Sequence, residues 1–178
     1  MPTINECLEF NKQFVADRRY EQYAAKPSQE RKLAIVTCMD TRLVELLPAA
    51  LGIENGQAKI IKNAGAIIVN SYGSVMRSLL LSVYALGVRE IMIIGHTDCG
   101  VKGLDVDKLL NVMRDRGVTE DAINQCPDVN QFFHAFTDDD ESIRHSMQIV
   151  RDHPMMPNDI PIRGFMMDVK DGHLREVN

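Results

Sequence analysis

The chain has 178 residues, 45% of them hydrophobic and 25% charged, which is ordinary for a globular protein with one core of its own. Its 20 Lys and Arg residues against 25 Asp and Glu residues give a net charge of -5, so no basic field attracts nucleic acid. Apolar runs such as residues 91–94 are far too short to cross a bilayer, and the N-terminus lacks the apolar run of a signal peptide. We expect a soluble, cytoplasmic protein with a single domain over residues 1–178 and with neither nucleic acid nor a membrane as partner.

The first elements are predicted from hydrophobic spacing. Residues 3–23 place apolar groups on one side of a helix, and residues 26–29 end it, so that residues 1–27 form an N-terminal helical arm. The continuous apolar run Leu33–Cys38 is rich in β-branched residues, which is typical of a strand covered on both faces of a parallel sheet. Residues 41–51 are predicted to form the next helix, because leucines recur along one side of it.

The middle of the chain repeats this alternation. Residues 59–62 read as a short second strand, and Asn63-Ala64-Gly65 turns away from it. Residues 71–86 have apolar groups at helical spacing, and Gly87 stops that helix. Residues 90–95 form the third predicted strand. Strands that alternate with helices require right-handed crossovers, and they predict a mostly parallel sheet.

The last part of the chain has a less regular pattern. Helices are predicted at residues 107–116 and 130–136. The acidic run at residues 138–141 is interpreted as the solvated start of a helix that continues to residue 151, because acids are favourable near the positive end of the helix dipole. Residues 162–169 form a final strand before a hairpin turn at Asp171-Gly172. The expected fold class is α/β, with a mostly parallel central sheet of about four to five strands flanked by helices and an N-terminal amphipathic helix.

Three residues that bind soft metals follow two of these strands. Cys38 closes the first strand, and His96 and Cys99 follow the third; the carboxyl ends of strands in an open α/β sheet meet at one edge. Two thiolates and one imidazole suit zinc and would reject hard cations such as magnesium. Three protein ligands leave a fourth position open, as in catalytic zinc sites, where the pKa of a bound water falls from 15.7 to about 7. Because two thiolates offset the charge of the cation, we expect activity that rises toward alkaline pH.

Two charged residues follow the first of these ligands. Asp40 and Arg42 lie two and four residues after Cys38, so both can face the same cleft. The carboxylate of Asp40 can accept a hydrogen bond from a water on the metal, or it can become the fourth ligand. Arg42 can hold Asp40 by a bidentate contact, which lowers the pKa of the carboxyl group. The sequence leaves both states of the fourth position open.

Taken together, these motifs resemble those of the β-class carbonic anhydrases. The pattern of that family is Cys-x-Asp-x-Arg, then Asn-Ala-Gly, then Gly-His-[Ser/Thr]-x-Cys-Gly, and the chain matches it at residues 38–42, 63–65 and 95–100. The likeness runs from about residue 33 to residue 103, and residues 164–174 are similar to the final strand and glycine turn of the family. The short chain looks like the compact subclass.

The resemblance implies a zinc enzyme, with Cys38, His96 and Cys99 as zinc ligands. It also implies that Asp40 and Arg42 form a catalytic dyad and that the reaction is the reversible hydration of carbon dioxide to bicarbonate, by a hydroxide that the zinc ion makes available.

The same resemblance implies where substrate binds and how the chain assembles. Gly65 and Ile67, at and just after the Asn-Ala-Gly turn, are expected to line the substrate pocket, although core packing explains Ile67 equally well. The family implies a homodimer or a higher homo-oligomer, with the N-terminal helix packed on the partner.

Other functions remain open at this stage. A related zinc hydrolase of carbon disulfide or carbonyl sulfide would carry the same motif. A non-catalytic zinc or redox-sensing protein would use Cys38 and Cys99 as thiols. Nucleotide binding is weakly supported, because Gly95, Gly100 and Gly103 do not form Gly-x-Gly-x-x-Gly.

Overall fold

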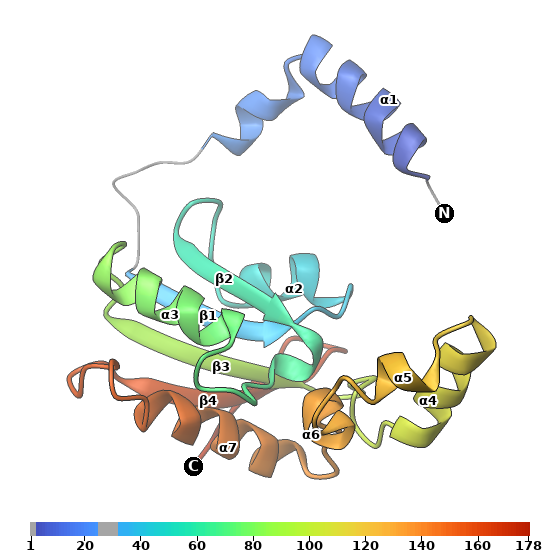
Figure 1. Cartoon of the computed structure of the whole chain (residues 1–178). Coiled ribbons are helices and arrows are strands. Elements are labelled where there is room, and N and C mark those ends of the chain that lie inside the picture. The colour runs from blue at the N-terminus through green and yellow to red at the C-terminus, as the bar shows by residue number, and fades with distance from the viewer. Residues whose placement is uncertain (1–2, 25–31) are drawn as a thin grey trace.

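The computed structural model describes residues 3–24 and 32–178, and its centre is one five-stranded sheet (Figure 1). The strands are β1 (Leu33–Cys38), β2 (Ala58–Asn63), β3 (Glu90–His96), β4 (Ile162–Met167) and β5 (Leu174–Val177). Their order across the sheet is β2-β1-β3-β4-β5. The first four strands run parallel, and β5 is antiparallel to β4. The expected mostly parallel α/β fold is confirmed, and the predicted hairpin turn at Asp171-Gly172 joins the antiparallel pair.

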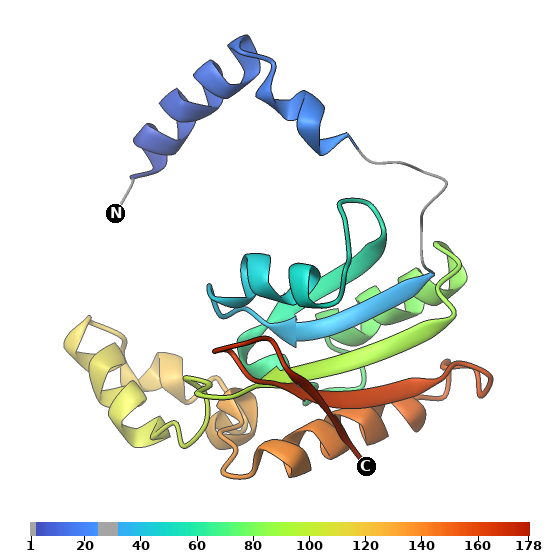
Figure 2. The same ribbon diagram turned by 180° about the vertical axis from the view of Figure 1, so that it is seen from behind.

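Helices cover both faces of this sheet. The described helices, not all of which lie on the sheet, are α1 (Ile4–Ala16), the 3-10 helix η1 (Arg19–Tyr23), α2 (Leu43–Ala50), the 3-10 helix η3 (Ala64–Ala66), α3 (Ser74–Tyr84), α4 (Val106–Asp115), α5 (Glu120–Ile123), α6 (Val129–Phe133) and α7 (Asp139–Arg151). Helices α3 and α7 cover one face and α2 covers the other, whereas α4, α5 and α6 gather beyond the carboxyl ends of the parallel strands (Figures 1 and 2). None of the described helices combines the length and the apolar character that crossing a bilayer requires.

The core has two parts because alternate strand residues point to opposite faces. Val36 and Ile93 pack with side chains of α3 and α7, and Ile35 and Ile94 pack with side chains of α2. All four strand residues are fully buried. Strands covered on both faces need apolar residues at every position, which explains why β1 and β3 were recognisable in the sequence as continuous apolar runs.

Two glycines allow α7 to lie directly on the sheet. A Cβ atom at Gly164 of β4 would overlap Ile143 and lie 2.9 Å from Met147 Sδ. A Cβ atom at Gly95 of β3 would lie 3.0 Å from Ile143 Cδ1. The close approach of this helix brings its first turn near the carboxyl end of β3.

The N-terminal helix is shorter than predicted. Helix α1 begins with a capping box at Thr3, as an N-terminus should, but it ends at Ala16, and Arg18 has a φ of 57°. The polar run at residues 17–19 offers no apolar side to a longer helix, and after the bend the Arg19 guanidinium lies 4.7 Å from the centre of the Phe10 ring. The predicted end at residues 26–29 lies outside the described residues.

Three further predictions about helices need correction. Helix α3 starts at Ser74 rather than at residue 71, because the side chain and carbonyl of Asn70 accept the N–H groups of Tyr72 and Gly73 in a turn. Helix α6 ends at Phe133, since His134 has a φ of 37°, so the predicted helix does not reach residue 136. Helix α5 was not predicted at all.

The acidic run opens α7 as expected, but its carboxylates also have partners. Asp138 is the N-cap and accepts the backbone N–H of Glu141. Lys102 pairs with Asp139 at 2.5 Å, and Arg175 pairs with Asp140 at 2.7 Å. The run therefore caps the helix and also ties it to the segment after Cys99 and to β5.

Candidate metal centre

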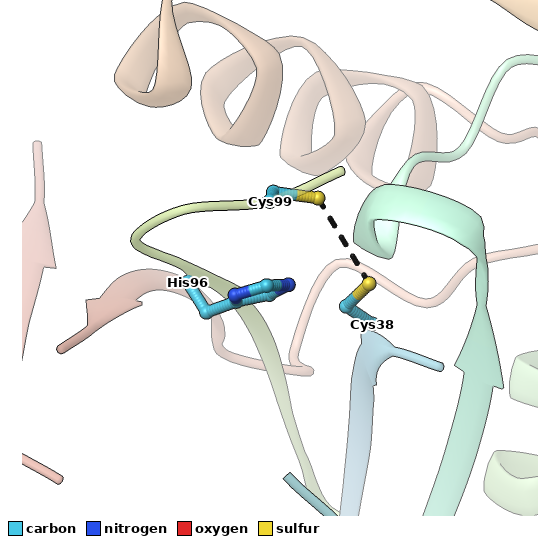
Figure 3. Close-up of side chains that lie close together, drawn as sticks. All are labelled: Cys38, His96 and Cys99. Atoms are coloured by element: carbon cyan, nitrogen blue, oxygen red, sulfur yellow. Dashed lines mark hydrogen bonds between the residues drawn. The ribbon is translucent and has the colours of Figure 1, made fainter. Parts of the chain in front are cut away.

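Three donor side chains converge at the carboxyl ends of β1 and β3 (Figure 3). The ligand atoms of Cys38, His96 and Cys99 all lie within 4.8 Å of one another. The three residues are only 4%, 2% and 7% exposed. Adjacent parallel strands end at the same edge of the sheet, so residues 58 positions apart in the chain meet there, as the sequence predicted.

The spacing of the two sulfurs suits a shared metal ion. Their Sγ atoms are 4.0 Å apart, whereas a disulfide would bring them to about 2.05 Å, and both thiols are free. Two sulfurs at about 2.3 Å from one tetrahedral zinc ion stand about 3.8 Å apart. The observed separation is close to that value, so the pair fits zinc without a change of backbone.

The imidazole of His96 is already oriented for binding. Its Nδ1 lies 2.7 Å from the carbonyl oxygen of Thr97, so Nδ1–H donates there and Nε2 carries the free lone pair. Nε2 is buried and has no hydrogen-bond partner among the described residues. Burial works against a charge on the ring, yet the nearby Cys38 sulfur and the Thr97 carbonyl raise the pKa of His96 above its usual value. A buried acceptor without a partner is costly, and a metal ion at the two sulfurs would satisfy it.

The contact between the two cysteines shifts the pKa values of their thiols in opposite directions. The hydrogen-bond contact with Cys99, in which either sulfur can donate, lowers the pKa of Cys38 to about 4 against the opposing effect of burial. The same contact raises the pKa of Cys99. The backbone N–H of Gly65 also donates to Cys38 Sγ at 3.3 Å. The contacts from Cys99 and Gly65 thus favour an ionised sulfur at Cys38, and the thiolate is the form of cysteine that binds metal ions.

Asp40 and Arg42 form a close pair beside these donors. Arg42 Nε lies 3.0 Å from Asp40 Oδ1, and Arg42 Nη2 lies 2.8 Å from Asp40 Oδ2. The backbone N–H of Arg42 also donates to Asp40 Oδ1 at 2.9 Å. The Arg42 side chain holds the pKa of the Asp40 carboxyl well below its usual range. Asp40 Oδ2 is 3.8 Å from His96 Nε2, so the carboxylate faces Arg42 and borders the donor group.

The turn between the ligands helps to place Arg42. Arg42 Nη2 donates to the carbonyl oxygen of Asp98 at 3.0 Å, and Asp98 has a φ of 55°. The loop that carries His96 and Cys99 is therefore linked to the loop after Cys38.

The two predicted substrate residues lie at different places. Gly65 lines a narrow cavity that also touches His96 and Cys99. Ile67 is buried and lines a separate cavity with Phe132 and Phe133. Only Gly65 borders the donor group, and Ile67 packs behind it.

The narrow cavity also contains residues that the sequence did not single out. Phe136 and Ile143 line it, together with Met166 of β4. Phe136 was placed in a helix, and no local pattern could bring it to the metal donors, because its position depends on a chain segment that returns from α4 to α6. The sequence likewise gave no sign of the Gly65 N–H contact to Cys38.

The fold is of the α/β class, and these donors form one group able to hold a soft or borderline metal ion. The comparisons with known proteins identify the family. A model described as "Carbonic anhydrase" matches residues 33–174. The chain is 40% identical over 178 residues to the Bacillus subtilis protein named "Putative carbonic anhydrase YvdA", covering 98% of this chain and 90% of the relative. It is also 31% identical over 157 residues to a carbon disulfide hydrolase of Acidithiobacillus thiooxidans, covering 82% of this chain and 76% of that protein.

A solved structure agrees with this assignment over the whole chain. The β-carbonic anhydrase isoform I of Trichomonas vaginalis superposes with a TM-score of 0.88 at 33% identity, covering 99% of this chain and 98% of that one. The chain therefore belongs to the β-carbonic anhydrase family and is an enzyme of that family. β-Carbonic anhydrases are zinc enzymes, and the chain has a Cys-His-Cys group able to hold the metal.

Proposed function

We propose that this chain catalyses the reversible hydration of carbon dioxide to bicarbonate and a proton, with zinc held by Cys38, His96 and Cys99. The proposal depends on one observation, namely that a metal-donor group and a carboxylate lie side by side. A buried three-donor group leaves one coordination position free, and an ionised carboxylate lies beside it under the control of Arg42. Zinc in such a site acts as a Lewis acid and makes hydroxide available near neutral pH.

The protein residues have separate tasks in this proposal. Cys38 Sγ, Cys99 Sγ and His96 Nε2 bind the metal, and the Thr97 carbonyl holds the His96 ring in the tautomer that exposes Nε2. Asp40 Oδ2 accepts a hydrogen bond from the attacking water, which directs a lone pair of that water at the substrate carbon.

Arg42 keeps the Asp40 carboxylate ionised and turned toward the centre. If this grip were released, Asp40 Oδ2, which is 3.8 Å from His96 Nε2, would lie near enough to compete for the fourth position. Carbon dioxide is apolar, so it needs no charged subsite. Gly65 and the apolar side chains of Ile143 and Met166 give the donor group the apolar surroundings that such a substrate favours, and Ile67 supports Gly65 from behind.

We also propose that the chain is cytoplasmic and works as a homodimer or higher homo-oligomer, residues 1–178 forming one domain with an N-terminal arm. Helix α1 supports the assembly. It has no buried residue, and in both views it lies away from the sheet (Figures 1 and 2). Its large apolar side chains Ile4, Leu8, Phe10 and Val15 are more than half exposed, and a second copy would cover them.

A second candidate is the hydrolysis of carbon disulfide or carbonyl sulfide, favoured by the identity of 31% to a carbon disulfide hydrolase. Both candidates use the same donors, so the metal site does not separate them. The test is to measure kcat/KM of one zinc-loaded preparation for carbon dioxide, by proton release, and for the two sulfur compounds, by release of hydrogen sulfide. Carbon dioxide as the preferred substrate supports the first proposal, and preference for a sulfur compound replaces it with the second.

A further inference from the structure

A narrow cavity beside the metal donors shares lining residues with a much larger cavity. The narrow cavity, which touches His96 and Cys99, has room of about 10 Å³ for the centre of a water molecule, which is the space of about one water. The larger cavity has about 290 Å³ on the same measure and is lined by His134, His145 and their neighbours. Phe136 and Ser142 line both cavities. Of these two shared residues, Phe136 is much the larger.

The Phe136 ring lies beside Gly65, which also lines the narrow cavity. A Cβ atom placed on Gly65 would be 3.3 Å from Phe136 Cε1, so the ring edge contacts the turn that donates to Cys38. Phe136 also packs on the core cluster that contains Cys38 and Cys99. Phe136 thus lies at the boundary between the narrow cavity beside the donors and the larger cavity.

The backbone holds this ring in a defined position. Phe136 forms an isolated parallel bridge with Lys102, and its carbonyl oxygen accepts the N–H of Gly103 at 2.8 Å. Lys102 in turn pairs with Asp139 at 2.5 Å, at the start of α7. Because the segment after Cys99 and the start of α7 are joined on both sides of Phe136, the backbone that carries the ring is held in place.

We propose that Phe136 is a specificity-determining residue: its ring closes the space beside the metal donors to molecules wider than carbon dioxide. This inference rests on the proposed function for the identity of the substrate. The restriction of the space beside the donors by the Phe136 ring does not depend on that function. The sulfur atoms of carbon disulfide are larger than the oxygens of carbon dioxide, so the ring disfavours the sulfur analogue. Shortening the side chain at position 136 joins the narrow cavity to the larger one and relaxes that selection.

The first test measures access to the donors without relying on catalysis. In a full-length Cys7→Ser, Cys126→Ser background, only Cys38 and Cys99 remain as thiols. The metal-free protein is treated with a bulky aromatic disulfide, 5,5′-dithiobis(2-nitrobenzoate), and with the small reagent methyl methanethiosulfonate. In Phe136→Ala, we expect the ratio of the bulky rate to the small rate to rise about tenfold or more, the scale on which apolar pockets discriminate size.

Two companion variants separate the ring from general loosening. Phe136→Leu keeps an apolar side chain that preserves packing and should give an intermediate ratio. Phe132→Ala removes a neighbouring phenylalanine that is 67% exposed and lines neither of the two cavities, so its ratio should equal that of the parent. An unchanged ratio in both Phe136 variants, or an equal rise in Phe132→Ala, overturns the proposal.

The second test uses the zinc-loaded protein. The ratio of kcat/KM for carbon disulfide to that for carbon dioxide should rise about tenfold in Phe136→Ala, with zinc content unchanged. If the parent protein hydrates no carbon dioxide but the thiol ratio rises as expected, the proposed function fails and the closure by Phe136 stands. If carbon dioxide is hydrated and neither ratio changes, the proposal for Phe136 fails and the function stands.

Discussion

The pairing of Arg42 with Asp40 yields a prediction that can be worked out in numbers. Arg42→Ala removes the two side-chain hydrogen bonds to Asp40, at 3.0 Å and 2.8 Å, and the contact to the Asp98 carbonyl. It keeps the backbone N–H that donates to Asp40 Oδ1 at 2.9 Å. The variant therefore frees the carboxylate side chain while the start of α2 stays intact.

The expected cost follows from those contacts. A hydrogen bond to a charged group contributes about 1.5–3 kcal/mol, and the lower figure applies here because the Arg42 side chain is 44% exposed. Losing two such bonds costs about 3 kcal/mol, which corresponds to a fall of about 100-fold in kcat/KM. Arg42→Lys keeps one charged contact but loses the planar fork, so its fall should be about tenfold.

The assay is stopped-flow hydration of carbon dioxide, with zinc content and thermal unfolding measured on the same samples. Arg116→Ala is the control, because it removes an exposed arginine at the end of α4. Zinc content should stay constant in all variants, since Arg42 is not a metal donor. The reasoning is refuted if both Arg42 variants keep activity within about twofold of the parent, or if zinc loss accounts for the decline.

Three other predictions concern stability, acid and metal. Gly164→Ala should lower the free energy of unfolding, measured in urea, by about 1–3 kcal/mol, because its Cβ atom meets Ile143 and Met147. The control is Gly100→Ala, whose Cβ atom meets nothing within 4 Å. This control should change the free energy of unfolding by less than about 0.5 kcal/mol. Arg175 lowers the pKa of Asp140 in the folded chain below the ordinary value of 3.8. The parent should therefore be more stable to unfolding than Asp140→Asn, with the full difference at pH values above 3.8. That difference should shrink as the pH falls further and Asp140 becomes protonated. Urea unfolding at neutral and at strongly acidic pH measures this difference in the free energy of unfolding. The same difference at both pH values would contradict the prediction. Cys99→Ser should lose most of its zinc on dialysis, whereas Cys126→Ser, outside the centre, should keep it; metal analysis that finds equal zinc in both would remove Cys99 from the ligand set.

The elements that the sequence predicted well are those whose signal is local. Strands β1 and β3 are buried on both faces, so each is an uninterrupted apolar run. The donors Cys38 and His96 end these strands, and parallel topology alone brings them together. Predicting the metal centre therefore needed only the two strands and their direction.

Other features depend on contacts that no local pattern contains. Phe136 reaches the donors because Lys102 and Gly103 bind its backbone across more than 30 residues of sequence, and a helix prediction at residues 130–136 hid that role. Helix α1 was predicted too long because apolar spacing is insensitive to a bend such as the one at Arg18. The partners of the acidic run, Lys102 and Arg175, are likewise distant in the chain.

The most direct test of the proposed function is carbon dioxide hydration measured from about pH 6.5 to 9, around the pKa of about 7 for water on catalytic zinc, with zinc determined on the same sample. The account predicts about one zinc per chain, because one three-donor group is present among the described residues. It also predicts activity that rises with pH and is almost lost in Asp40→Ala. A fully zinc-loaded protein that hydrates no carbon dioxide at any of these pH values would contradict the proposed function and leave only the metal site.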